Sequence, residues 1–158
     1  MKQIPLKGKY ANGRFILVDD EDYEKISKSS WSILDKNNDY ATATIDSKKV
    51  MLHRYLMDCP KGLCVDHINL DTLDNRKENL RICTHSENNR NKKPYGSTSK
   101  YKGVRKAGKK FRACIEQKNK GKRTRYSLGT FDTEVEAAAA YNAKAKELFG
   151  EFAYLNKI

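Results

Sequence analysis

Short apolar runs separated by charged stretches characterise the first fifty residues of the chain. Two of these runs, residues 15–18 and 40–45, predict strands because β-branched and aromatic residues dominate them. Between them, the segment that begins at Asp19 or Asp20 and reaches Ser29 predicts a helix. Its first residues are acidic, and acidic residues are favoured in the first turn of a helix. Residues 1–52 are therefore expected to form a β-rich region, in which no catalytic chemistry is visible.

The middle of the chain predicts a strand, a loop, a second strand and a short helix. The first strand ends in Asp66-His67, and the second covers residues 79–83. Thr84 followed by Glu87 is a capping box, which predicts a helix that starts there and runs towards the end of this region. Residues 53–93 are therefore expected to form a compact unit.

The last third of the chain predicts a sheet followed by a helix. The expected strands are 101–106, 110–118 and 122–129, with turns at Gly108 and at 119–121. Thr133 and Glu136 form a capping box that starts the helix, and Gly150 stands where a left-handed cap would end it. The apolar stripe that should pack on the sheet is Val135, Ala138, Tyr141, Ala145, Leu148 and Phe149. Residues 94–100 are expected to be a linker and residues 101–158 a separate domain.

Alternation along these strands separates an apolar face from a basic face. The predicted apolar face, towards the helix, contains Phe111, Ala113, Ile115, Tyr126 and Leu128. The opposite face then collects Lys110, Arg112, Arg123 and Arg125. A sheet that presents guanidinium groups can enter the major groove of DNA and pair with guanine. The alternative is a face that binds phosphates only.

The positive charge of the chain is concentrated in the same region. The 158 residues carry a formal net charge of +12, and residues 92–130 hold 14 Lys and Arg against one acid, Glu116. Residues 1–91, by contrast, hold 15 basic and 14 acidic residues. A basic block favours a polyanionic partner, because neutralising phosphates releases counterions. The alternative, a solvated basic tail, conflicts with the alternating apolar residues, so double-stranded DNA is the expected partner.

Composition disfavours several other classes of protein. No stretch approaches the roughly 18 uninterrupted apolar residues of a membrane span, and the first residues lack the pattern of a signal peptide. We therefore expect a cytoplasmic protein that is neither secreted nor bound to a membrane. A chain of this size leaves little room for a deep cavity, so no small-molecule substrate is expected. The four cysteines lack C-x-x-C spacing, and reduced thiols are expected.

Asp66 and His67 carry groups that phosphodiester hydrolysis requires, a carboxylate to bind a cation and a base to activate water. A neutral imidazole, with an ordinary pKa of about 6.5, makes His67 the expected base. The amide of Asn79 is expected to orient this ring, and Asn88 to supply a second oxygen ligand. Oxygen ligands suit Mg²⁺, for which Mn²⁺ often substitutes.

Five motifs stand in a recognisable order: His53-Arg54, residues 65–69, 73–76 and 78–81, and Thr84-x-x-Glu87-Asn88. With these motifs the chain resembles HNH endonucleases of the ββα-metal fold, particularly the homing endonucleases of phage and bacterial introns. The resemblance implies that Asp66 and Asn88 bind the metal, that His67 is the general base and that Asn79 is its orienting partner. His85 is an alternative metal ligand, and Arg76 and Arg81 are expected to bind DNA phosphates. The cysteine spacing lacks the paired knuckles of zinc-stapled relatives, which disfavours structural zinc.

A second set of motifs covers residues 101–105, 128–133, 136–138, 140–142 and 155–156. These motifs resemble the DNA-binding domain of plant Apetala-two and ethylene-response transcription factors. The resemblance implies a sheet that lies in the major groove, with contacts from Arg105, Lys110, Arg112 and Arg125. Cys114, Glu116 and Ser127 depart from the plant pattern, so the plant target sequence is not implied.

The predicted fold is α+β: a small ββα-metal nuclease unit with an N-terminal β-rich extension, followed by a three-stranded antiparallel sheet packed on one helix. The predicted function is a homing-type DNA endonuclease that uses a divalent metal, is targeted by its C-terminal domain and acts inside a bacterial or phage-infected cell. The alternative is a catalytically inactive DNA-binding protein, a transcription regulator with a degenerate HNH fold. The target sequence, any protein partner, and the choice between nicking and double-strand cleavage stay open.

Overall fold

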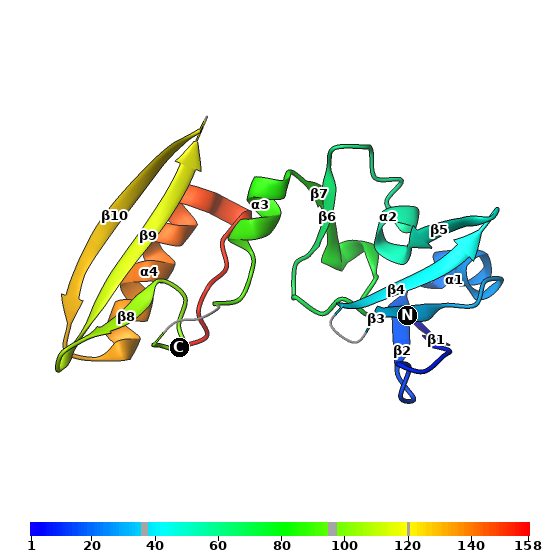
Figure 1. Cartoon of the computed structure of the whole chain (residues 1–158), viewed down its shortest axis with the longest axis horizontal. Coiled ribbons are helices and arrows are strands. Elements are labelled where there is room, and N and C mark those ends of the chain that lie inside the picture. Colours follow the sequence, from blue (N-terminus) through cyan, green and yellow to red (C-terminus); the bar gives the residue numbers. More distant parts are fainter. Residues whose placement is uncertain (36–37, 95–97, 120) are drawn as a thin grey trace. The chain divides into compact units, whose positions relative to one another are not determined.

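The structure is a computed structural model that describes residues 1–35, 38–94, 98–119 and 121–158. Its contacts divide the chain into two compact units, Met1–His85 and Ser86–Ile158. Both units combine helices with antiparallel sheets (Figure 1). Along the described ranges, no helix combines the length and apolar character needed to cross a bilayer.

The first unit begins with two small antiparallel sheets and one helix. The elements are β1 (Lys2–Pro5), β2 (Phe15–Val18), α1 (Asp20–Ser27), β3 (Ser32–Asp35), β4 (Asn38–Ile45) and β5 (Lys48–Met51). β1 pairs with β2, and the second sheet has the order β3-β4-β5. Ile16, Ile26 and Trp31 lie in their common core, where Trp31 Nε1 donates to the Ile26 carbonyl at 2.8 Å. The predicted strands at 15–18 and 40–45 are confirmed, whereas the helix ends at Ser27 instead of Ser29.

The rest of the first unit carries the predicted strand, loop and strand. The elements are α2 (Leu52–Leu56), β6 (Cys64–His67), the 3₁₀ helix η1 (Lys77–Asn79), β7 (Leu80–Cys83) and α3 (His85–Arg90), whose last residues belong to the second unit. β6 and β7 are antiparallel, with Asp66 opposite Arg81 and His67 opposite Leu80. Both predicted strands are therefore confirmed, and β6 ends at His67 as expected.

The second unit is a three-stranded antiparallel sheet packed on one helix (Figure 1). Its elements are β8 (Val104–Ala107), β9 (Lys110–Asn119), β10 (Lys122–Phe131), α4 (Glu134–Phe149) and the 3₁₀ helix η2 (Gly150–Phe152). The predicted capping box of α4 is confirmed, since the Glu136 amide donates to Thr133 Oγ1 and the Thr133 amide donates to Glu136 Oε2. Ala138, Tyr141 and Ala145 are buried against the sheet, as predicted.

Two details of the predicted helix are wrong. Val135 is 49% exposed, and Ala137 takes the buried position in the first turns because the apolar stripe runs through the alanines. Gly150 has the positive φ of +55° but a ψ of −128°, which lies outside the left-handed helical region. The helix therefore passes directly into η2.

Two predicted segments fall partly outside the described residues. These are the linker at 94–100, of which 95–97 are not described, and the turn at 119–121, of which Lys120 is not described. The contacts divide the chain once, after His85, which is not one of the predicted domain limits. The limits at residues 52, 93 and 100 stay a prediction.

Candidate active site and nucleic-acid interface

Three rings from separate segments of the first unit gather at the end of β6. His67 is the last residue of β6, His53 lies in α2 and Tyr40 lies in β4. The ring centroids of His53 and His67 are 5.2 Å apart, and the Tyr40 centroid is 5.0 Å from His53 and 6.0 Å from His67. Residues 1–52, in which the sequence shows no catalytic chemistry, thus contribute Tyr40 to this cluster of rings.

Burial determines the charge of both histidines. His67 is 4% exposed, and desolvation is the largest influence on its pKa, which it lowers from 6.5. The neighbouring Asn75 side chain is the largest influence that raises this pKa. For His53, burial lowers the pKa from 6.5 to about 3, with smaller contributions from His67 and Arg54. Both imidazoles are neutral at pH 7, which is the state that a general base requires.

The carboxylate beside His67 is held by a guanidinium. Arg81, directly opposite Asp66 on β7, donates from Nε and Nη2 to Asp66 Oδ2 at 3.0 and 2.7 Å. Asp66 is 3% exposed, and a buried carboxylate needs such a compensating charge. Arg81 is predicted from the sequence to bind phosphate, and in the structure it contacts the carboxylate that is predicted to bind the metal.

The amide of Asn79 bonds to the loop between β6 and β7. Its Oδ1 accepts from the Asn69 amide at 2.9 Å, and its Nδ2 donates to the Asp74 carbonyl at 2.8 Å. The neighbouring Asn75 is 1% exposed, and its Nδ2 donates to the Thr72 carbonyl at 3.2 Å. The role of Asn79 in orienting the His67 ring stays a prediction.

The same loop is stabilised by Arg76, the second predicted phosphate-binding residue of the first unit. Arg76 Nη2 lies 2.7 Å from Asp74 Oδ2, and its Nη1 also contacts Glu78. Arg76 is the main reason that the pKa of Asp74 lies below its ordinary value. These contacts make Arg76 part of the frame of the loop.

The predicted metal ligands differ in their surroundings. His85 Nδ1 lies 3.1 Å from Cys64 Sγ, while Asn88 lies in the part of α3 that belongs to the second unit. No group of three or more His, Cys, Asp or Glu side chains placed to hold a metal occurs within the described residues. Mg²⁺ does not need such a group, because one or two carboxylates, waters and substrate phosphates complete its coordination. The oxygen donors of Asp66 fit a site of this kind.

The predicted DNA-binding residues of the second unit share one face of its sheet. Ala113 and Ile115 are buried towards α4, so the residues that alternate with them on β9 point away from the helix. The strand register places neighbouring residues of β8 and β10 on that same face. The exposed basic residues are Arg105, Lys110, Arg112, Arg123 and Arg125. Three of them make exposed contacts with neighbouring side chains: Lys110 with Asp132 at 2.9 Å, Arg123 with Glu116 at 3.7 Å and Arg125 with Cys114 Sγ at 3.4 Å.

Comparison with known proteins identifies the class to which this fold and site belong. Residues 57–90, which contain Asp66, His67, Asn79 and Asn88, match the family described as HNH endonuclease. A protein of Acanthamoeba polyphaga mimivirus, named an uncharacterized HNH endonuclease, is 34% identical over 153 residues, which cover 92% of this chain and 76% of that protein. The chain belongs to the HNH endonuclease family.

Part of the chain is also similar to plant proteins. Dehydration-responsive element-binding protein 2D of Arabidopsis thaliana is 45% identical over 64 residues, covering 40% of this chain and 30% of that protein. Dehydration-responsive element-binding protein 2E of Oryza sativa subsp. japonica is 44% identical over 64 residues, covering 40% and 20%. No solved structure shows a significant match.

Proposed function

We propose that this protein hydrolyses phosphodiester bonds of double-stranded DNA with a divalent metal, as a homing-type endonuclease. The observation that carries the proposal is the adjacency of a buried carboxylate, Asp66, and a neutral imidazole, His67, at the end of β6 in a chain of the HNH family. The homing role rests on the resemblance of the motifs to homing endonucleases.

The roles of the residues in the first unit follow from their chemistry. His67 takes the proton of the attacking water. Asn79, the orienting partner that the motif predicts, keeps the loop before β7 closed, and Arg81 holds Asp66 in place with two hydrogen bonds. Asp66 would hold Mg²⁺ or Mn²⁺, which supplies positive charge to neutralise the phosphate during hydrolysis. Asn88 as a second ligand is proposed from the motif alone. His85 is the alternative to Asn88.

The second unit would bring the substrate to this chemistry. The exposed basic face of its sheet carries donors that suit phosphates and the O6 and N7 atoms of guanine. The partial similarity to dehydration-responsive element-binding proteins supports DNA as the partner. We propose that Arg105, Lys110, Arg112, Arg123 and Arg125 bind the target site, with Arg76 and Arg81 near the cleaved strand.

The direct test is incubation of supercoiled plasmid with the protein in Mg²⁺, with and without EDTA. The expected product is metal-dependent open-circular DNA, and His67→Ala should slow its formation by about 10²–10⁴-fold while DNA affinity is retained. Asp66→Asn should also abolish cleavage. Asp71→Asn is the control for a nearby carboxylate, because the Asp71 side chain lies in the loop after β6 and accepts from the Leu73 amide at 3.0 Å.

The outcome also separates the proposal from its alternative. Linear product would indicate paired cleavage of both strands. If plasmid and the natural target both survive in Mg²⁺ and Mn²⁺ although the protein binds them, the protein is a DNA-binding regulator with a degenerate HNH fold.

A further inference from the structure

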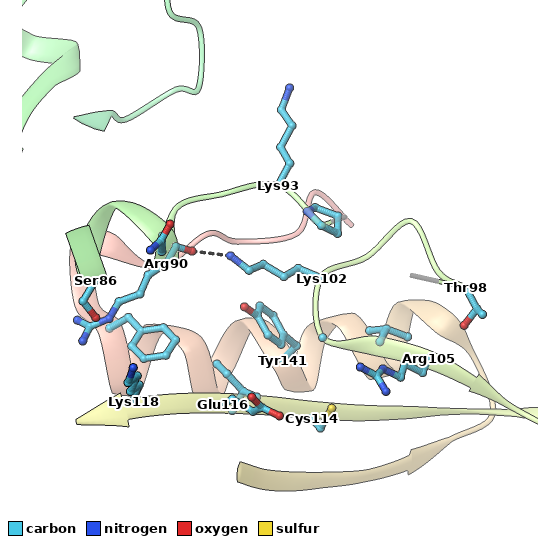
Figure 2. Close-up of a pocket in the computed structure, with 16 residues that line it drawn as sticks. Ser86, Arg90, Lys93, Thr98, Lys102, Arg105, Cys114, Glu116, Lys118 and Tyr141 are labelled. Atoms are coloured by element: carbon cyan, nitrogen blue, oxygen red, sulfur yellow. Dashed lines mark hydrogen bonds between the residues drawn. The ribbon is translucent and has the colours of Figure 1, made fainter. Parts of the chain in front are cut away.

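A pocket of about 790 Å³ lies wholly within the second unit (Figure 2). It is bounded by α3, by the start of β8, by residues 114–118 of β9 and by α4. In β9, only residues 110–113 pair with β8, and Ala113 lies opposite Val104, the first residue of β8. The following residues of β9, 114–118, therefore extend past β8. The pocket therefore lies at the edge of the sheet and shares Arg105 with its exposed basic face.

The wall of the pocket contains a tyrosine hydroxyl that bonds to no described protein group. Tyr141 is 3% exposed as a whole residue, and its hydroxyl makes no hydrogen bond with any residue that the structure describes. Figure 2 shows this hydroxyl on the side of the ring that faces Lys102. A ligand oxygen in the pocket could therefore accept a hydrogen bond from it.

A second wall contains a lysine that lacks an acidic partner. Lys102 Nζ donates to the carbonyls of Arg90 and Lys92 at 2.6 and 2.7 Å, and no carboxylate of the described residues pairs with it. Burial, with the nearby charge of Lys92, lowers its pKa to about 8. An anion in the pocket would offset this desolvation.

The remaining charges of the lining are mainly positive. The Arg90 guanidinium lies 4.9 Å from the centre of the Phe149 ring, and its backbone carbonyl is the part of Arg90 that contacts Lys102. Arg105 and Lys118 also line the pocket, whereas Lys93 points away from it. The one acid of the described lining, Glu116, lies 3.7 Å from Arg123, which offsets its charge. The pocket thus combines excess positive charge with an unused hydroxyl.

We propose that this pocket binds a phosphate group, with the Tyr141 hydroxyl, Lys102 and Arg90 as its donors. The phosphate belongs either to the DNA backbone or to a free nucleotide, since both present the same oxygens. As a backbone site it rests on the proposed function, because it would hold a DNA phosphate next to the basic face of the sheet, with which it shares Arg105.

The test uses the full chain in EDTA, so that DNA is bound and not cut. The variants are Tyr141→Phe alone, which removes only the hydroxyl, and Tyr141→Phe with Lys102→Met. The matched control is Tyr126→Phe with Lys144→Met, because Lys144 lies over the Tyr126 ring on the same unit, away from the pocket. Two readouts are taken: NMR shifts of the Gly103 and Cys114 amides on titration with inorganic phosphate or thymidine monophosphate, and duplex affinity at several salt concentrations.

Phosphate should shift these amides saturably, whereas chloride at equal ionic strength should not, and Tyr141→Phe should weaken this binding several-fold. If DNA occupies the pocket, the double variant should lose about tenfold in duplex affinity. The slope of log K against log salt concentration should also become shallower by about 0.9 relative to the control.

Phosphate shifts with unchanged DNA affinity would assign the pocket to a free nucleotide. If neither phosphate nor DNA distinguishes the variants from the control, the proposal is wrong. If the protein does not bind DNA, the proposed function is wrong. The phosphate titration then tests by itself whether the pocket binds phosphate.

Discussion

At the scale of single residues, burial is the main influence on the charges around His67. His53 and His67 lie in edge contact in the interior of the first unit, where little solvent is available to stabilise a positive charge on either ring. Protonation of His53 should affect stability strongly, because burial lowers its pKa from 6.5 to about 3. The folded state therefore binds fewer protons than the unfolded state between these values.

Acidification should consequently destabilise the first unit. The stabilisation is fully present above the unfolded pKa of 6.5 and is lost as the pH falls towards about 3. We expect the free energy of unfolding to fall by on the order of 3 kcal/mol between pH 6.5 and pH 4, measured by urea unfolding. His53→Gln should flatten this dependence. An equally steep pH profile in that variant would show that the decline comes from other groups.

At the scale of elements, the close contact of β8 with α4 depends on one glycine. Gly103 precedes β8 with a φ of +77°, and a Cβ there would lie 2.0 Å from Tyr141 Cδ2 and 2.6 Å from the Cys114 carbonyl oxygen. The Gly103 carbonyl also accepts from the Cys114 amide at 2.9 Å. Both backbone conformation and space therefore exclude a side chain at this position.

Gly103→Ala should destabilise the second unit by about 3 kcal/mol or more, because left-handed strain and a clash with backbone add together. Gly108→Ala is the matched control: its φ is +64°, but nothing lies within 4 Å of an added Cβ, so only strain of about 1–2 kcal/mol is expected. Thermal unfolding of both variants measures the difference. Equal losses would mean that the packing around Gly103 adjusts freely.

At the scale of the whole molecule, the excess positive charge lies mainly in the second unit. Nearly all of the excess positive charge lies in residues 92–130, and the exposed basic face of the sheet carries much of it. In the first unit, by contrast, Arg76 and Arg81 are paired with carboxylates. The second unit is therefore the better candidate for first contact with DNA.

Arg125→Ala should weaken binding to a selected target site more than binding to random DNA. A bidentate contact to guanine contributes about 1–3 kcal/mol of discrimination, roughly a tenfold preference or more, whereas a phosphate contact contributes equally to both DNAs. Competition binding at fixed salt measures the ratio. Arg14→Ala, which removes an arginine paired with Asp39 in the first unit, should leave both affinities unchanged. Equal losses on the two DNAs for Arg125→Ala would reduce it to a phosphate contact.

The sequence by itself determined the elements whose signals are local. The capping box of Thr133 and Glu136, the alternation on β9 and the strand that ends in Asp66-His67 depend on neighbouring residues only, and the structure confirms each of them. Backbone hydrogen bonding and side-chain periodicity act over a few residues, so such patterns can be interpreted without a fold.

Only the tertiary structure decided which distant side chains meet. Tyr40 and His67 are in ring contact across 27 positions of the chain, Arg81 lies against Asp66, and the Asn79 side chain bonds to Asn69 and Asp74. The pocket around Tyr141 likewise draws its wall from α3, β9 and α4. These contacts follow from burial and packing among segments that are far apart in sequence, and the local pattern of apolar and polar residues contains no record of them.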